Sequence, residues 1–281
     1  MEFSYGHTPF LIFLAGTNRM RTLIYQYWNG KRPEYTYASE ELFREYSKRI
    51  GADYLLGDGG GPIRCLYKRY FGALLPIYSE FFWNYDYVLY VDMDVIPMDA
   101  LFENIFDHAQ FDFMMSEETE QPEIRSRMKG NINSLNDKIW MDAVKKFWNI
   151  DVDVDYKGRP LVYNSGVVLY SNAGMRKMKS ILPPVLLYQL IMKLKKLPRF
   201  YSLDQNYLNS FKNLPGVGFG SLDRCWNSQV TRWNDMKGFP HLEDHRTDNT
   251  KFVHLQHGSA KNLMSKKQAL DVAISRYKFE I

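Results

Sequence analysis

Val88-Leu-Tyr-Val-Asp92-Met-Asp94-Val-Ile-Pro97 is the most informative segment of this chain of 281 residues. A buried apolar strand is predicted over 87–91, and two carboxylates spaced two positions apart follow at its carboxyl end. Carboxylates beside an apolar core are costly unless a positive group meets them. In open α/β sheets, ligands bind at this edge. Two interpretations stay open: Asp92 and Asp94 hold one hard divalent cation, or they cap the next helix or pair with Lys or Arg.

The residues before this segment predict alternating strands and helices. Ser39 is predicted to cap a helix whose apolar residues recur at helical spacing until Gly51 ends it. In order, we expect a strand at Phe10–Ala15, a helix at Asn18–Trp28, a helix at Ser39–Ile50, a strand at Asp53–Leu56, a helix at Ile63–Trp83 and a strand at Tyr87–Val91. This alternation indicates a parallel sheet with crossover helices.

The residues after this segment predict a decorated second half. We expect strands at Phe111–Met115, Leu161–Tyr170 and Lys251–Leu255, a helix at Arg176–Leu197 interrupted at Pro183–Pro184, and a helix at Leu203–Phe211. The residues 117–159 show no clear period and are interpreted as an excursion over the sheet. The prediction is one α/β domain over 1–281, with a mainly parallel central sheet flanked by helices.

Composition excludes several classes of protein. The chain is 45% hydrophobic, which excludes disorder, and its 36 Lys and Arg against 32 Asp and Glu leave a net charge of +4. That charge is too small and dispersed to make nucleic acid the default partner. Cys65 and Cys225 lie far apart without ligand-like neighbours, so neither a disulfide framework nor a thiolate metal site is predicted.

No apolar run approaches the roughly 18 residues of a membrane span, and no basic segment precedes the N-terminal apolar run as in a secretory signal. A cytoplasmic location is therefore expected. One concentrated basic patch remains, and it is interpreted as a solvated helix end, with peripheral contact to an anionic membrane or an acidic glycan as alternatives. It consists of Lys193, Lys195, Lys196 and Arg199.

Four segments in this order resemble the GT-A fold nucleotide-sugar glycosyltransferases, most nearly glycosyltransferase family 8. They are Val88-Leu-Tyr-Val-Asp92-Met-Asp94, Asn164-Ser165-Gly166-Val-Val-Leu, Leu203-Asp204-Gln205-Asn-Tyr-Leu-Asn209 and Phe252-Val-His254-Leu-Gln-His257-Gly258-Ser-Ala-Lys261. The resemblance implies a Rossmann-like GT-A domain with a nucleotide-binding half over about 8–116 and an acceptor-side half over about 117–281. That second half would contain the C-terminal metal and diphosphate segment.

The resemblance also implies roles for single residues. Asp92 would face the ribose and the metal, Asp94 would be a principal ligand, and Gly258 and Lys261 would approach the diphosphate. A C-terminal histidine would complete the shell for Mn²⁺ or Mg²⁺, the ions that carboxylates favour over zinc. The family spaces this motif His-x-x-Gly-x-x-Lys, whereas His254 lies four residues before Gly258 and His257 immediately before it. Which histidine binds metal is therefore open.

The family's sugar-facing positions fall on Asn164, Ser165, Gly166, Asp204 and Gln205. If the transfer inverts the anomeric carbon, Asp204 is the natural base for the acceptor hydroxyl, and if it retains, Gln205 or a substrate group faces the reacting atom. For these positions an ordinary turn and a plain helix start are the alternatives.

Other residues have weaker assignments. The fold implies a seat for the nucleotide base and ribose at Ala15-Gly16-Thr17, with a plain loop as the alternative. Lys68 and Arg69 are interpreted as a solvated helix face rather than a phosphate contact. Candidate residues of an acceptor pocket are Glu117, Glu118, Trp226, Asn227 and Trp233, although any one tryptophan fits the core equally well.

The sequence thus predicts a metal-dependent glycosyltransferase that moves a glucose, galactose or xylose type of sugar from a UDP-sugar to a hydroxyl of a glycan acceptor. One alternative is a haloacid-dehalogenase-like phosphatase with Asp92 as nucleophile and Asp94 as acid/base. That motif usually opens its domain, and no later acidic pair completes its magnesium site here. The other alternative is a non-catalytic nucleotide- or glycan-binding protein.

Overall fold

The computed structural model of the chain describes residues 20–59, 61–67, 70–127, 130–233, 241–256 and 265–274. Its centre is a six-stranded sheet in the order β2-β1-β3-β6-β5-β7. These strands are β1 (Thr22–Tyr27), β2 (Asp53–Gly57), β3 (Tyr87–Val91), β5 (Phe113–Glu117), β6 (Tyr163–Ser171) and β7 (Phe219–Ser221). Three of the five pairings are parallel, and β6 runs antiparallel to both β3 and β5. The predicted α/β class with a mainly parallel central sheet is confirmed.

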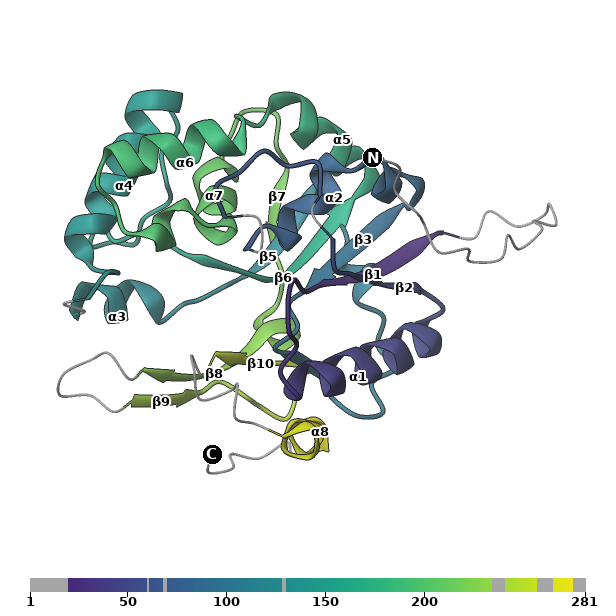
Figure 1. Cartoon of the computed structure of the whole chain (residues 1–281). Helices are drawn as coiled ribbons and strands as arrows, with labels where there is room; N and C mark the ends of the chain where they lie inside the picture. Colours follow the sequence, from purple (N-terminus) through teal and green to yellow (C-terminus); the bar gives the residue numbers. More distant parts are fainter. Residues whose placement is uncertain are drawn as a thin grey trace.

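A second sheet of four strands, in the order β4-β10-β8-β9, lies below the first (Figure 1). Its strands are β4 (Val95–Pro97), β8 (Ser228–Trp233), β9 (His241–Asp244) and β10 (Phe252–Gln256). The chain passes from the large sheet to the small one between β3 and β4, which are separated only by residues 92–94. The segment singled out in the sequence is therefore the junction of the two sheets.

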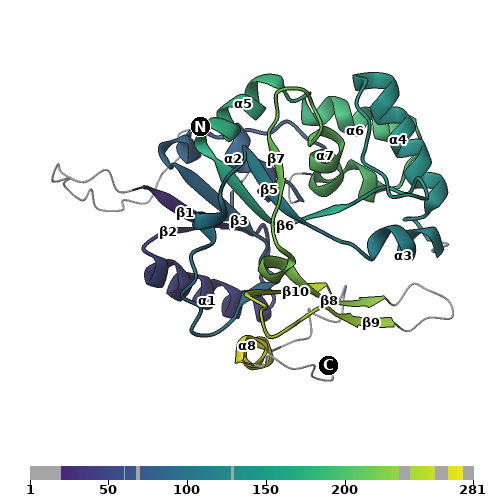
Figure 2. The ribbon, with the colours of Figure 1, turned by 180° about the vertical axis from the view of Figure 1, so that it is seen from behind.

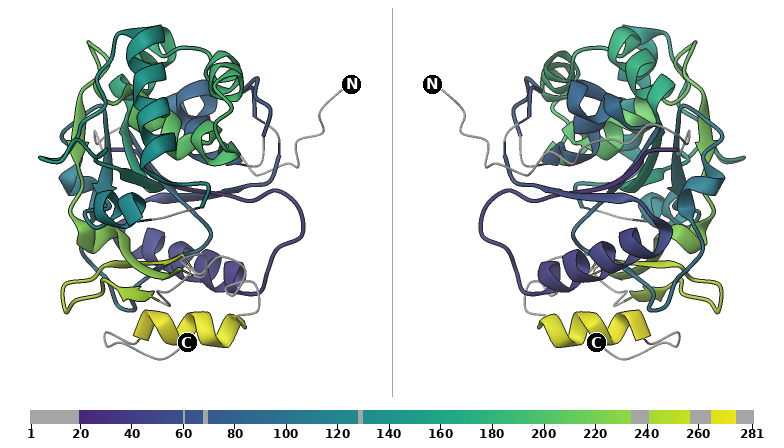
Figure 3. Two further views of the ribbon diagram at one scale, coloured as in Figure 1. Left: turned by 90° about the vertical axis from the view of Figure 1, so that its left-hand side faces the viewer. Right: turned by 90° about the vertical axis from the view of Figure 1, so that its right-hand side faces the viewer.

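Helices cover both faces of the six-stranded sheet. On one face lie α1 (Tyr35–Ile50), the small sheet and α8 (Lys266–Ile274), and on the other lie α2 (Leu75–Tyr78), α5 (Asn172–Ile181), α6 (Val185–Leu194) and α7 (Asp204–Phe211) (Figures 1–3). Two more helices, α3 (Gln121–Arg127) and α4 (Ser134–Trp148), flank the second half. Short 3₁₀ turns occur at Gly72–Leu74, Glu80–Asn84, Ile105–His108, Arg199–Ser202 and Arg224–Asn227. None of the helices in the described ranges is both long and apolar enough to cross a bilayer.

Burial on both faces explains why the central strands read as continuous apolar runs. In β3, Leu89 and Val91 face a core cluster shared with α1, whereas Val88 and Tyr90 face the cluster beneath α2 and α5–α7. The strand predicted at 87–91 is confirmed. So are the strand predicted at Asp53–Leu56, which is β2, and the helix predicted at Leu203–Phe211, which is α7. The predicted helix break at Pro183–Pro184 separates α5 from α6.

Several predicted elements are wrong. The helix expected at Asn18–Trp28 is contradicted by β1, because Thr22-Leu-Ile-Tyr-Gln-Tyr27 is fully buried and rich in β-branched and aromatic side chains, which fit a pleated sheet. The long helix expected at Ile63–Trp83 is only the short α2 and its flanking turns, since Gly72 and Pro76 interrupt it. The excursion at 117–159 contains α3 and α4. The strand expected at Phe10–Ala15 lies outside the described residues.

Ser39 does not cap α1, which begins at Tyr35. Its buried hydroxyl instead donates to the carbonyl of Val95 at 2.6 Å and accepts from Gln26 Nε2 at 2.8 Å. The predicted cap residue therefore joins α1, β1 and β4 beneath the Asp92–Asp94 turn. This contact helps fix the turn from below.

Candidate metal and nucleotide site

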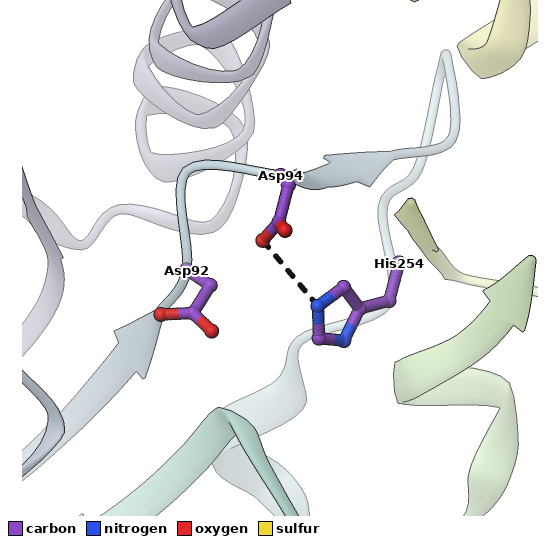
Figure 4. A group of neighbouring side chains, drawn as sticks. All are labelled: Asp92, Asp94 and His254. Atoms are coloured by element: carbon purple, nitrogen blue, oxygen red, sulfur yellow. Dashed lines mark ion pairs between the residues drawn. The ribbon is translucent and has the colours of Figure 1, made fainter. Parts of the chain in front are cut away.

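A tight turn, rather than a strand, brings the two aspartates together. β3 ends at Val91, and the amide of Val95 closes the turn by donating to the carbonyl of Asp92 at 3.1 Å. The Asp92 amide donates to Gly166 of the large sheet, and the Asp94 carbonyl accepts from Leu255 of the small sheet, each at 2.8 Å. Both backbones are thus anchored, which holds the two carboxylates on the same side (Figure 4).

His254 completes a three-residue cluster with these carboxylates. Its Nε2 lies 3.3 Å from Asp94 Oδ1, and one potential ligand atom from each of Asp92, Asp94 and His254 lies within 4.8 Å of the others (Figure 4). His254 is on β10, whose pairing with β4 places it opposite Val95. Two carboxylates with one imidazole form a donor set suited to Mn²⁺ or Mg²⁺. His257, the other candidate histidine, lies outside the described residues.

Gly166 makes room for the imidazole. A Cβ atom at this position would lie 2.3 Å from His254 Cε1 and 2.8 Å from its Nδ1. The glycine predicted to let a sugar approach therefore lets His254 approach β6. Because Gly166 lies within β6 together with Asn164 and Ser165, the alternative of an ordinary turn is wrong.

A buried chain of hydrogen bonds orients His254. Its Nδ1 lies 2.9 Å from Asn227 Oδ1, Asn227 Nδ2 donates to Asn164 Oδ1 at 3.1 Å, and Asn164 Nδ2 donates to a Glu118 oxygen at 2.7 Å. A carboxylate only accepts hydrogen bonds, so Glu118 requires the amide nitrogen of Asn164 to face it. The orientation of the Asn164 amide then fixes that of the Asn227 amide, so Asn227 turns its oxygen toward His254 Nδ1.

This chain of hydrogen bonds also decides which atom His254 presents to Asp94, on the opposite side of the imidazole ring. With its hydrogen on Nδ1, neutral His254 points the lone pair of Nε2 at the carboxylate of Asp94. Two acceptors at 3.3 Å repel each other unless a cation or a proton lies between them. Buried partners that fix the tautomer of a histidine in this way are a regular feature of metal sites in proteins.

Glu118 is the fixed end of this chain. It is 4% exposed, and four side-chain amides surround it: Asn164, Gln229, Gln256 and Gln205, at 2.7, 3.0, 3.4 and 3.5 Å. A carboxylate solvated by amides stays anchored without a cation of its own. Glu118 thereby links Gln205, a predicted sugar-facing residue, to the group that orients His254.

A cavity of about 580 Å³ opens beside Asp92 and Asp94, within the range of nucleotide-sized ligand sites. Its walls include Tyr35, Tyr70, Tyr90 and Asp204, together with the last residue of β1 and the four residues after it: Tyr27, Trp28, Asn29, Gly30 and Lys31. The carboxyl ends of β1 and β3 therefore frame one cavity. This is the edge at which open α/β sheets bind ligands.

Two titratable groups line the cavity, the buried Tyr90 and the half-buried Asp204. Tyr90 Oη donates to Asp92 Oδ1 at 2.5 Å, and burial, reinforced by Asp92 and Asp204, raises the pKa of this tyrosine well above its usual value. Burial, with the repulsion of Asp92, also raises the pKa of Asp204 well above that of an ordinary aspartate. The arrangement places an excess of acidic groups around one point, which suits a divalent cation.

No protein-family model matches the sequence, and no curated protein is significantly similar to it. The solved structure of the galactosyltransferase LgtC, in complex with donor and acceptor sugar analogues, superposes over 89% of this chain and 95% of that one, with a TM-score of 0.52 and 13% identity. The chain has a GT-A glycosyltransferase fold.

Two further solved structures are also similar to the chain. One is a glycosyltransferase involved in glycosylation of the major capsid of PBCV-1, with 13% identity, 90% and 98% coverage of this chain and that one, and a TM-score of 0.48. The other is mouse xyloside xylosyltransferase 1, with 16% identity, 84% and 96% coverage, and the same TM-score of 0.48.

Several site predictions fall elsewhere on this GT-A fold or outside the described residues. Trp226 is 1% exposed and packs on Phe252 with a ring distance of 5.1 Å, so it is a core residue and not a wall of an acceptor pocket. The first nucleotide contact expected at Ala15, Gly16 and Thr17, the diphosphate contacts Gly258 and Lys261, and the basic pair Lys68 and Arg69 are outside the described part of the chain.

The cavity wall at 27–31 was not predicted because a helix, and not a strand, was expected at Asn18–Trp28. The signal was available, since Trp28-Asn29-Gly30 follows an aromatic and β-branched run directly. The amide cluster around Glu118 had no such signal. Its members come from β6, α7, β8 and β10, and only the folded sheets bring them together.

Proposed function

We propose that this chain is a divalent-metal-dependent glycosyltransferase that moves a sugar from a UDP-sugar to a hydroxyl of a glycan acceptor. The observation that carries the proposal is the convergence of Asp92, Asp94 and His254 at the edge of the cavity. Mn²⁺ or Mg²⁺ held there would neutralise the diphosphate as the nucleotide departs. The GT-A fold supports the same interpretation.

The run 27–31 and Tyr35 are proposed to receive the nucleotide. Trp28 and the neighbouring tyrosines offer flat apolar faces for a base, and Asn29 and Lys31 offer polar contacts to ribose and phosphate. Tyr90 holds Asp92 by its hydrogen bond, so that this carboxylate keeps one orientation while it contacts ribose or metal. Lys261 and Gly258 stay candidates for the diphosphate.

Asp204 and Gln205 are proposed to face the donor sugar. Asp204 accepts a hydrogen bond from the Gln205 amide at 2.8 Å, while the Gln205 side chain contacts Glu118 and Asn164, each at 3.5 Å. These bonds leave Gln205 oriented by two neighbours before any sugar arrives. A carboxyl with a raised pKa, such as Asp204, is well suited to exchange a proton with a sugar hydroxyl.

The decisive experiment is UDP release from candidate UDP-sugars, measured with and without metal. EDTA should abolish release and Mn²⁺ restore it, whereas Asp94→Asn should lower kcat/KM at least a hundredfold because it removes a charged ligand. Asp99→Asn, an exposed carboxylate just after β4, is the matched control and should keep full activity. Full activity in chelator, or normal turnover by an Asp92→Asn/Asp94→Asn double variant, would end the proposal.

The alternatives predict different results in the same assays. A haloacid-dehalogenase-like phosphatase would release phosphate from simple monoesters without any nucleotide. A non-catalytic binding protein would raise its melting temperature with UDP and Mn²⁺ yet never turn over a donor. The histidine in the cluster favours the transferase, since the phosphatase motif calls for further carboxylates there instead.

A further inference from the structure

Helix α6 is apolar on its exposed side as well as on its buried side. Surface helices turn polar residues to water and apolar ones to the core. In α6, Gln189 is completely buried and hydrogen-bonds to the Leu66 amide and the Ser202 carbonyl. Leu187, Leu190 and Leu194, in contrast, are 46%, 43% and 79% exposed.

These three leucines form one continuous stripe. Their spacing of three and then four residues places them on the same face of a helix. α6 belongs to the outer layer of helices beside α4 (Figure 1), and Phe147 at the end of α4 is 47% exposed. Lys195 lies over the Phe147 ring, with Nζ 5.8 Å from its centre. We call these three leucines with Phe147 the α6 face.

Cations border the α6 face without any acidic partner. Within the described residues, Lys193, Lys195 and Lys196 form no ion pair. The sequence around them is also free of acids: residues 156–203 contain nine Lys and Arg and no Asp or Glu. Such a long acid-free run is notable in a chain whose total charges nearly balance.

We propose that the α6 face docks on an anionic lipid membrane surface. The leucines and Phe147 would enter the boundary between headgroups and acyl chains while the lysines contact anionic headgroups, which is how interfacial amphipathic helices bind. A second copy of the chain fits less well, because a symmetric contact through this face would bring two unpaired lysine clusters of the same sign together. The proposal is independent of the chemistry at the Asp92–His254 cluster.

Flotation of the purified full chain with lipid vesicles tests this. We expect binding to phosphatidylcholine vesicles containing about a third phosphatidylserine, weak or no binding to phosphatidylcholine alone, and loss of binding at high salt. Lys193→Ala/Lys196→Ala should lower the partition coefficient about 25-fold, since each juxtamembrane lysine contributes about fivefold. Leu190→Ser/Leu194→Ser should lower it at least tenfold with the charge unchanged.

The matched control is Lys48→Ala/Lys267→Ala, which removes the same charge from exposed positions on α1 and α8, across the sheet from α6. It should bind vesicles within about twofold of the wild type. An equal loss in both lysine variants would reduce the effect to overall charge and overturn the proposal. No vesicle binding by the wild type would overturn it too, as would dimerisation that Leu190→Ser/Leu194→Ser abolishes in the absence of lipid.

Discussion

The hydrogen-bond chain that ends at His254 predicts how the cluster responds to a change at Asn227. Asn227→Ala removes the acceptor at 2.9 Å from His254 Nδ1, so the imidazole loses the partner that keeps its hydrogen on that nitrogen. The other tautomer, with hydrogen on Nε2, can then donate to Asp94. A hydrogen would occupy the place in which a metal ion is expected.

The size of the effect follows from one buried hydrogen bond. Its loss costs about 1–1.5 kcal/mol, and moving the hydrogen back for metal binding would add a similar amount. With about 1.4 kcal/mol for each factor of ten, we expect Mn²⁺ affinity to fall about 10- to 100-fold. Folding should be retained, because Asn164 Oδ1 still accepts from the Gly166 amide at 2.8 Å.

The assay is a calorimetric titration of Mn²⁺ into the protein, with nitrogen NMR of the His254 ring to identify its tautomer without metal. Asn227→Asp is the matched variant: one carboxylate oxygen keeps an acceptor beside Nδ1 and should hold the tautomer, whereas the other replaces the Nδ2 that donates to Asn164 Oδ1, so part of the affinity should be lost. Equal affinity in the wild type and Asn227→Ala would refute the orienting role of the chain. Equal loss in the alanine and aspartate variants would show that an acceptor beside Nδ1 is not what maintains the affinity, and would refute the orienting role as well.

Two further predictions concern packing and pH. Gly166→Ala should displace His254, weaken Mn²⁺ binding at least tenfold and lower the melting temperature. In the double variant Gly166→Ala/His254→Ala the melting temperature should recover, which calorimetry of the double variant and both single variants checks. Burial lowers the pKa of Lys212 from 10.5 to about 8. The unfolded chain therefore binds the extra proton between these pH values, and wild-type stability should rise relative to Lys212→Met as the pH increases from about 8 to 10.5. Urea titrations across this range check the trend, and a flat or falling difference would contradict it.

The sequence predicted those elements whose side chains alone decide the structure. The β3 strand and the aspartates after it were readable because an apolar run buried on both faces leaves little ambiguity. The helices after Pro183–Pro184 and at α7 were readable from periodicity and proline chemistry. The prediction of a helix at β1 was wrong because apolar residues in this part of the sequence recur about every four positions, which also fits a helix. Only the place of the segment between β2 and β3 decides that it is a strand.

The site could be predicted only in part from the sequence, because some of its residues act through contacts that only the folded chain makes. Asp92, Asp94 and His254 were predicted because each follows or occupies an apolar strand within a recognisable motif. Glu118 and Asn227 were named only as candidate residues of an acceptor pocket. Each contacts Asn164 from more than forty positions away in sequence, so no local pattern could reveal their role in orienting His254. The role of Gly166 likewise depends on the ring of His254 packed against it.

The position of the Asp92–Asp94 turn has a mechanical consequence. Asp92 is bonded to the large sheet and Asp94 to the small one, and His254 belongs to the small sheet as well. An ion bound by all three residues would connect the large sheet to the small one. Saturation with Mn²⁺ should therefore slow amide hydrogen exchange in β8 and β10 more than in β2, which lies at the far edge of the large sheet. Exchange in the small sheet would thus report whether a bound ion connects the two sheets.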